Sequence, residues 1–109
     1  PSIPSPAKIH PVEGKVVKEY RVEYSDLDEN RHMNTAKYAE HVFDLFPLEF
    51  FDKMRLSRLD MMFLREAKFG DMLQFVLQEM PNGEKSIEVR GEGGNAINRI
   101  KMSFVEREK

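Results

Sequence analysis

The feature that most restricts the fold of this 109-residue chain is the spacing of its apolar residues, which changes twice along the sequence. Between Lys15 and Tyr24, apolar and charged residues alternate, and this spacing predicts a half-buried strand. From Asn34 to Phe46 the apolar residues recur every three or four positions, which predicts one amphipathic helix with Asn34 as its N-cap. The polar face of that helix carries Lys37, Glu40, His41 and Asp44. We expect His41 on this face to be solvated.

After the helix, the sequence returns to strand-like spacing. The predicted elements are a short helical turn over Leu48–Met54 and four strands over Leu56–Glu66, Met72–Glu79, Ser86–Glu92 and Ala96–Val105. Asn82-Gly83 and Gly93-Gly94 are turn signals, and tight turns join antiparallel neighbours. One helix against one antiparallel sheet is an α+β arrangement.

The N-terminal residues and the composition restrict the classes of function. Residues 1–13 contain four prolines, so we expect a proline-rich linker there and one domain over residues 14–109. A chain that begins with Pro1 suggests a processed or shortened protein in which something preceded the linker. The net charge of −2 gives no basic groove for nucleic acid, and no apolar run is long enough to span a membrane. The chain has no cysteine, which excludes a cysteine nucleophile and a disulfide within it.

A dense polar segment precedes the predicted helix. It places Asp26, Asp28, Asn30, His32 and Asn34 at alternate positions. A helix N-terminus offers unpaired N–H groups and a partial positive charge, so a site there can hold the oxygen of a polarised carbonyl. Asp, Asn and Ser also dominate ordinary turns and caps. The residues alone leave both interpretations open.

A metal site fits this segment poorly. Asp26, Asp28 and Asn30 match the first ligands of a calcium-binding loop, but Arg31 stands where that loop needs glycine and Lys37 where it needs glutamate. The three histidines lack the spacing of zinc ligands. We predict no metal.

Two blocks of sequence resemble a known family. The first is Tyr24–Asn34 followed by Lys37-Tyr38, and the second is Phe63–Ala67 followed by Gly70-Asp71. Together they resemble the signature of plant and bacterial acyl–acyl-carrier-protein thioesterases, over roughly residues 12–106. The resemblance implies the second, C-terminal of two hotdog domains, in which a curled antiparallel sheet surrounds a central helix. It also implies a soluble, cytoplasmic enzyme that needs no metal or organic cofactor.

The resemblance also assigns site residues. It implies catalytic roles for Asp28, Asn30, His32 and Glu66, and substrate-binding roles for Asn34 and Tyr38. Thr35 and Ala67 depart from the family pattern. Plant members carry a cysteine at the position of Ala67. With no thiol in the chain, we expect water to attack, activated by Glu66 or by a Glu66–His32 pair. Without the resemblance, we would interpret Glu66 as a surface carboxylate.

The activity implied is hydrolysis of fatty acyl–acyl-carrier-protein thioesters to free fatty acid. The implied partners are the acyl carrier protein with its acyl-phosphopantetheine arm and an N-terminal hotdog domain, with a homodimer expected for the isolated domain. The isolated domain can also be inactive. Two alternatives stay open: a non-catalytic domain for acyl binding or dimerisation, and an acyl-CoA thioesterase. The basic residues near the site offer a docking patch for an acidic carrier, with a solvated surface as the default: Arg31, Lys37, Arg55, Arg58, Arg65 and Lys68.

Overall fold

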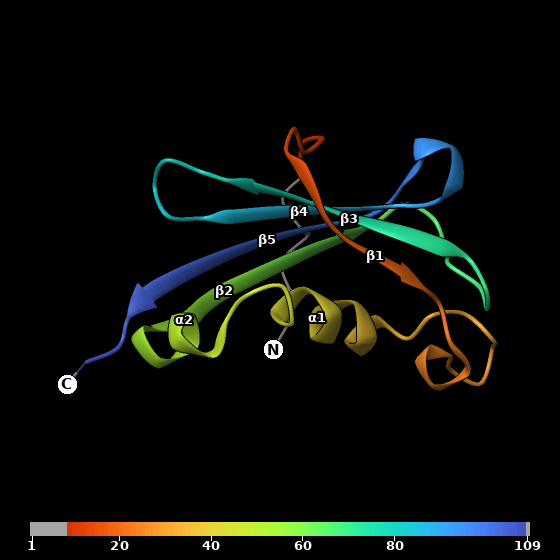
Figure 1. Ribbon diagram of the computed structural model, residues 1–109, viewed down its shortest axis with the longest axis horizontal. Helices are drawn as coiled ribbons and strands as arrows, with labels where there is room; N and C mark the ends of the chain where they lie inside the picture. The colour runs from red at the N-terminus through yellow and green to blue at the C-terminus, as the bar shows by residue number, and fades with distance from the viewer. Residues whose placement is uncertain (1–8, 109) are drawn as a thin grey trace.

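An antiparallel sheet curls around one helix, as Figure 1 shows. The computed structural model describes residues 9–108. Its elements are β1 (Lys15–Arg21), the 3₁₀ turn η1 (Tyr24–Asp26), α1 (Thr35–Phe43), α2 (Leu48–Lys53), β2 (Met54–Phe63), β3 (Met72–Glu79), β4 (Lys85–Arg90), the 3₁₀ turn η2 (Glu92–Gly94) and β5 (Ala96–Glu106). The predicted order of strand, helix and four strands is confirmed. No helix within the described residues is long and apolar enough to cross a membrane.

The five strands form one sheet in the order β1-β3-β4-β5-β2, and every pair is antiparallel. The predicted α+β class is therefore confirmed. Strands β1 and β2 are the two edges of the sheet, and the loop that precedes α1 emerges beside β1. The curl brings this loop under the same face of the sheet as the helix (Figure 1).

The core lies between α1 and the concave face of the sheet. Tyr38 and Val42 of the helix are fully buried there. Alternate residues of the central strands meet them: Leu73, Phe75, Ile87, Val89, Ile100 and Met102. Burying one such side chain stabilises the fold by about 1.5–3 kcal/mol. The helix on which the site depends is thus fixed against the sheet.

The structure corrects the predicted first strand and the end of the helix. Strand β1 ends at Arg21 rather than at Tyr24, and a bulge between Val16 and Lys18 shifts its register. Because the chain then bends into η1, Tyr24 is 82% exposed instead of half-buried. Helix α1 ends at Phe43 rather than at Phe46, because the chain turns before Pro47.

The prediction of a solvated His41 is wrong. The side chain of His41 is only 14% exposed. Lys18 and Tyr20 of β1 lie against it, with the Tyr20 and His41 rings 4.1 Å apart. Helical spacing shows that this face is polar, but it does not show that a strand packs on it.

Residues 9–14, the N-terminal strap, lie on the outer face of the sheet. Ile9 and Val12 are buried there. The Val12 amide donates to Oε1 of Glu88, and Arg90 Nη2 donates to the carbonyl oxygen of Val12 at 2.8 Å. The last part of the predicted linker is therefore attached to the sheet, while residues 1–8 lie outside the described residues.

Candidate active site

The polar segment before α1 forms a tight loop, residues 27–33, which we call the site loop. Leu27 and Met33 pair across its base, and the Asp28 amide donates to the His32 carbonyl oxygen at 2.9 Å. The Arg31 amide closes the turn by donating to the Asp28 carbonyl oxygen at 3.0 Å. Arg31 has a φ of 66°, a conformation that side-chain-bearing residues adopt only when the surroundings impose it.

The Asp28 side chain determines the shape of this loop. Its Oδ1 accepts hydrogen bonds from the backbone amides of Asn30 at 2.9 Å and His32 at 3.1 Å. These bonds offset the local strain at Arg31 and hold the backbone at Asn30 and His32. Asp28 is thus placed to orient the loop.

The site loop is attached to the segment that follows β2. The Met33 amide donates to the Ala67 carbonyl oxygen at 2.9 Å, and His32 forms an isolated bridge with Lys68. This pairing places Glu66 beside the loop. Nε2 of His32 lies 3.0 Å from Oε2 of Glu66, with the side chains 35% and 66% exposed. The structure thus brings together two of the predicted catalytic residues.

Two hollows flank the site loop. The smaller, of about 320 Å³, is lined by Asp28, His32, Met33, Thr35, Tyr38, Phe63, Leu64, Arg65 and Glu66. The wider, of about 1000 Å³, is lined by Tyr24, Ser25, Leu27, Asp28, Glu29, Asn30, Arg31, His32, Lys68 and Phe69. Asp28 and His32 line both hollows. Asn30 lines only the wider of the two, and Glu66 lines only the smaller.

The two predicted substrate-binding residues have different surroundings. Asn34 is the N-cap of α1, and its side chain accepts a hydrogen bond from the Ala36 amide at 2.8 Å. It lines neither hollow. Tyr38 lines the smaller hollow, with its ring edge-on to Phe63 at 5.8 Å. Burial raises the pKa of the Tyr38 hydroxyl to about 12, so this group is neutral at pH 7.

The His32–Glu66 pair fits general acid–base chemistry. An ionised carboxylate only accepts hydrogen bonds, so a neutral His32 carries its proton on Nε2 and donates it to Glu66. Nδ1 is then free to accept a proton. Thr35, the first residue of α1, lines the same hollow, where helix amides create a partial positive charge. Ala67 is fully buried and provides no nucleophile.

Sequence reasoning missed one polar cluster beside the site. Asp26 and His41 lie 3.2 Å apart and are largely buried. The sequence showed Asp26 in the alternating polar segment, but nothing in it indicated that His41 is its partner. Within residues 9–108, the structure has no group of three or more His, Asp or Glu side chains able to hold a metal ion.

Several solved structures of thioesterases share this fold. An acyl-ACP thioesterase from Bacteroides thetaiotaomicron aligns with a TM-score of 0.87 and 35% identity over 94% of this chain and 42% of its own. The 12:0-ACP thioesterase from Umbellularia californica aligns with a TM-score of 0.79 and 21% identity over 96% of this chain and 40% of its own. A Thermus thermophilus thioesterase complexed with coenzyme A and Zn has the same fold, with a TM-score of 0.70 and 19% identity over 89% of this chain and 83% of its own. The fold therefore defines this chain as a hotdog-fold domain of the thioesterase class, as predicted.

The family itself follows from the sequence match. Residues 9–106 match the family model of the acyl-ACP thioesterase C-terminal domain. The chain therefore belongs to the acyl-ACP thioesterase family, and the predicted resemblance is confirmed. It spans about two fifths of the length of the first two structures, at 42% and 40%. No curated protein matches the chain.

Proposed function

We propose that this domain supplies the groups that hydrolyse a fatty acyl thioester carried by acyl carrier protein. The observation that carries the proposal is the 3.0 Å contact between His32 and Glu66 beside a hollow. Glu66 holds the imidazole so that Nδ1 accepts a proton from water as the water oxygen attacks the thioester carbonyl. The tetrahedral intermediate then collapses, the carbon–sulfur bond breaks, and the imidazolium returns the proton to the thiolate. The products are a free fatty acid and a thiol.

Each hollow offers a hydrogen-bond donor that can stabilise a carbonyl oxygen placed beside His32. The side-chain NH₂ group of Asn30 on the wider hollow and the backbone amide of Thr35, the first residue of α1, on the smaller one are hydrogen-bond donors. Negative charge develops on this oxygen in the transition state, so positioned donors lower the barrier. Removing one such donor costs about 10²–10³-fold in kcat in enzymes that use them.

The wider hollow suits the carrier side of the substrate. Exposed aromatic rings of Tyr24 and Phe69 line it together with Arg31 and Lys68. Apolar walls fit the pantetheine arm, and the two cations complement its phosphate and an acidic carrier protein. The Bacteroides protein at 35% identity carries acyl-ACP in its name, which favours this carrier over coenzyme A.

The smaller hollow suits the acyl side and a partner domain. Phe63 and Leu64 are exposed at its rim, on and just after the edge strand β2. Apolar side chains beside an unpaired sheet edge favour association with another sheet. We assign this edge to an N-terminal hotdog domain or, for the isolated domain, to a second copy.

The experiment measures release of free thiol from dodecanoyl–acyl carrier protein by the natural protein that carries this domain. His32→Ala and Glu66→Gln should each lower kcat by about 10²–10⁴-fold, the usual contribution of acid–base groups. Glu49→Gln is the control, since Glu49 is exposed on α2, away from both hollows. Wild-type rates in both site variants would refute the proposal and favour a non-catalytic acyl-binding domain. An equal or higher kcat/KM for dodecanoyl-CoA would instead favour an acyl-CoA thioesterase.

A further inference from the structure

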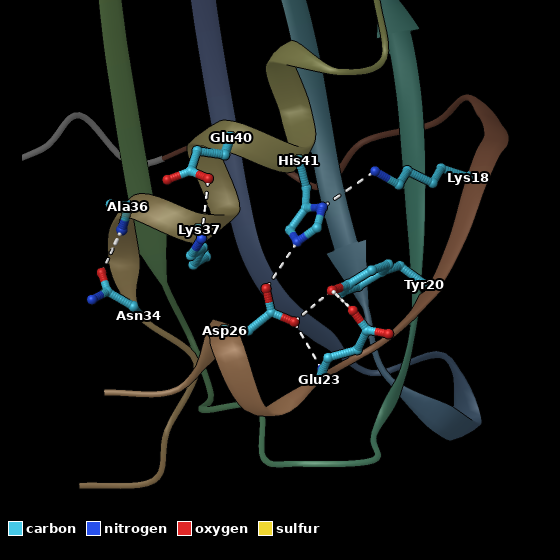
Figure 2. Close-up of polar contacts among 9 residues, drawn as sticks. All are labelled: Lys18, Tyr20, Glu23, Asp26, Asn34, Ala36, Lys37, Glu40 and His41. Carbon is cyan, nitrogen blue, oxygen red and sulfur yellow. Dashed lines mark hydrogen bonds and ion pairs between the residues drawn. The ribbon is translucent and has the colours of Figure 1, made fainter. Parts of the chain in front are cut away.

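Asp26 is the centre of a buried polar cluster next to the site loop. The residue is 2% exposed. Its Oδ2 accepts hydrogen bonds from the Tyr20 hydroxyl at 2.6 Å and the Glu23 amide at 2.8 Å, while Oδ1 faces Nε2 of His41 at 3.2 Å (Figure 2). Burial raises the pKa of Asp26, but these hydrogen bonds outweigh it and hold the pKa below its ordinary value. Asp26 is therefore an ionised carboxylate with both oxygens occupied.

The contacts of His41 define its protonation. Nζ of Lys18 lies 3.2 Å from Nδ1 of His41 (Figure 2). An ammonium group only donates, so Nδ1 must accept, and the ring proton must be on Nε2, facing Asp26. His41 is thus a neutral bridge between a lysine cation and a buried carboxylate. The adjacent Tyr20 ring and the buried Phe75 ring, with centroids 4.1 Å and 6.1 Å from the imidazole, restrict its rotation.

This cluster holds both ends of the site loop. Asp26 immediately precedes the loop, and Asn34 immediately follows it. The Asn34 amide donates to the Asp26 carbonyl oxygen at 2.8 Å. Asn34 is also the N-cap of α1, the helix that carries His41. The Asp26 side chain and backbone therefore connect the start of the loop, the helix and the end of the loop in one closed ring of contacts.

We propose that Asp26 and His41 are positioning residues that hold the site loop so that His32 reaches Glu66. This inference rests on the proposed hydrolysis. Neither residue lines the hollows on the two sides of the loop, so both act through the loop backbone. A displacement of about 1 Å in a reacting group can cost 10²-fold in rate, and the His32–Glu66 contact depends on the loop's place.

The first test compares two substitutions of His41 in the natural protein. In His41→Gln, the carboxamide oxygen can accept from Lys18 and its N–H can donate to Asp26, as neutral histidine does. In His41→Leu both bonds are lost. We expect kcat to fall about 10–100-fold for His41→Leu with KM within about 3-fold, and His41→Gln to stay within about 3-fold of wild type. Glu40→Gln is the control, because Glu40 is on the same helix and pairs only with Lys37 among the described residues.

The second test uses hydrogen exchange of the 109-residue chain. His41→Leu should raise exchange of the Met33 and Asn34 amides about 10-fold or more while amides of β3 and β4 keep their protection. Asp26→Asn should do the same, and it serves if His41→Leu does not fold. Unchanged exchange at Met33 and Asn34 in a folded variant overturns the proposal, and so does a His41→Gln enzyme as slow as His41→Leu. If the wild-type protein hydrolyses no thioester, the proposed function fails, while the exchange result still decides whether the cluster holds the loop.

Discussion

Replacing Glu88 by glutamine should weaken the attachment of the N-terminal strap and destabilise the domain. Glu88 is 4% exposed on the outer face of the sheet. Its carboxylate accepts from Arg90 Nε at 2.6 Å, Arg99 Nε at 2.8 Å and the Val12 amide at 3.2 Å. A glutamine keeps one acceptor oxygen but directs an NH₂ group at an arginine. The two arginines then lose their buried counter-charge.

The magnitude follows from these contacts. A hydrogen bond to a charged group contributes about 1.5–3 kcal/mol, and removing one partner of a buried ion pair costs about 3–5 kcal/mol. The side chain of Arg90 is 31% exposed and that of Arg99 16%, so water screens part of this loss. We therefore expect Glu88→Gln to lower the free energy of unfolding by about 2–3 kcal/mol. For a domain of this size that corresponds to a Tm lower by roughly 10–20 °C.

The assay is urea and thermal unfolding of the 109-residue chain followed by far-UV circular dichroism, since the chain has no tryptophan. Glu79→Gln is the matched control. The Glu79 side chain is 65% exposed and pairs with Lys85, so its loss should cost at most about 1 kcal/mol. If Glu88→Gln is no more destabilising than Glu79→Gln, the strap is not held by this carboxylate and the reasoning is refuted.

Two further predictions concern stability. Gly14→Ala should lower the free energy of unfolding by about 1–3 kcal/mol, because a Cβ there would lie 2.0 Å from the Leu77 carbonyl oxygen of β3. The midpoint of urea unfolding measures this loss. A midpoint equal to that of the Glu13→Ala variant would contradict the prediction. Stability should also fall in acid: the pKa values of Asp26 and Glu88 are held below their ordinary 3.8 and 4.5, so the unfolded chain takes up these protons at higher pH than the folded one. The stabilisation from these two carboxylates is complete above about pH 5 and is lost as the pH falls through their lowered pKa values. Midpoints of urea unfolding at pH 7, 5, 4 and 3 test this. Equal midpoints at pH 5 and pH 3 would argue against the prediction.

The spacing of apolar residues in the sequence was enough to predict the helices and strands, because each period corresponds to one local backbone geometry. Alternating apolar residues predicted β2, β4 and β5, a more evenly apolar run predicted β3, and a spacing of three to four residues predicted α1, each within a few residues of its observed ends. The polar segment and Glu66 could also be selected from the sequence, through their resemblance to the family signature. These features depend on residues close together in the chain.

The tertiary structure alone decided which of those residues meet. His32 and Glu66 are in contact because the site loop pairs with the segment after β2, whereas Asn30 lines a different hollow from Glu66. His41 has the spacing of a solvated helix residue, yet it is largely covered because β1 packs over it. A periodic pattern shows which face of an element is polar, whereas the partner on that face comes from a distant segment. The sequence thus determined the elements and the candidate residues, and long-range packing determined the site.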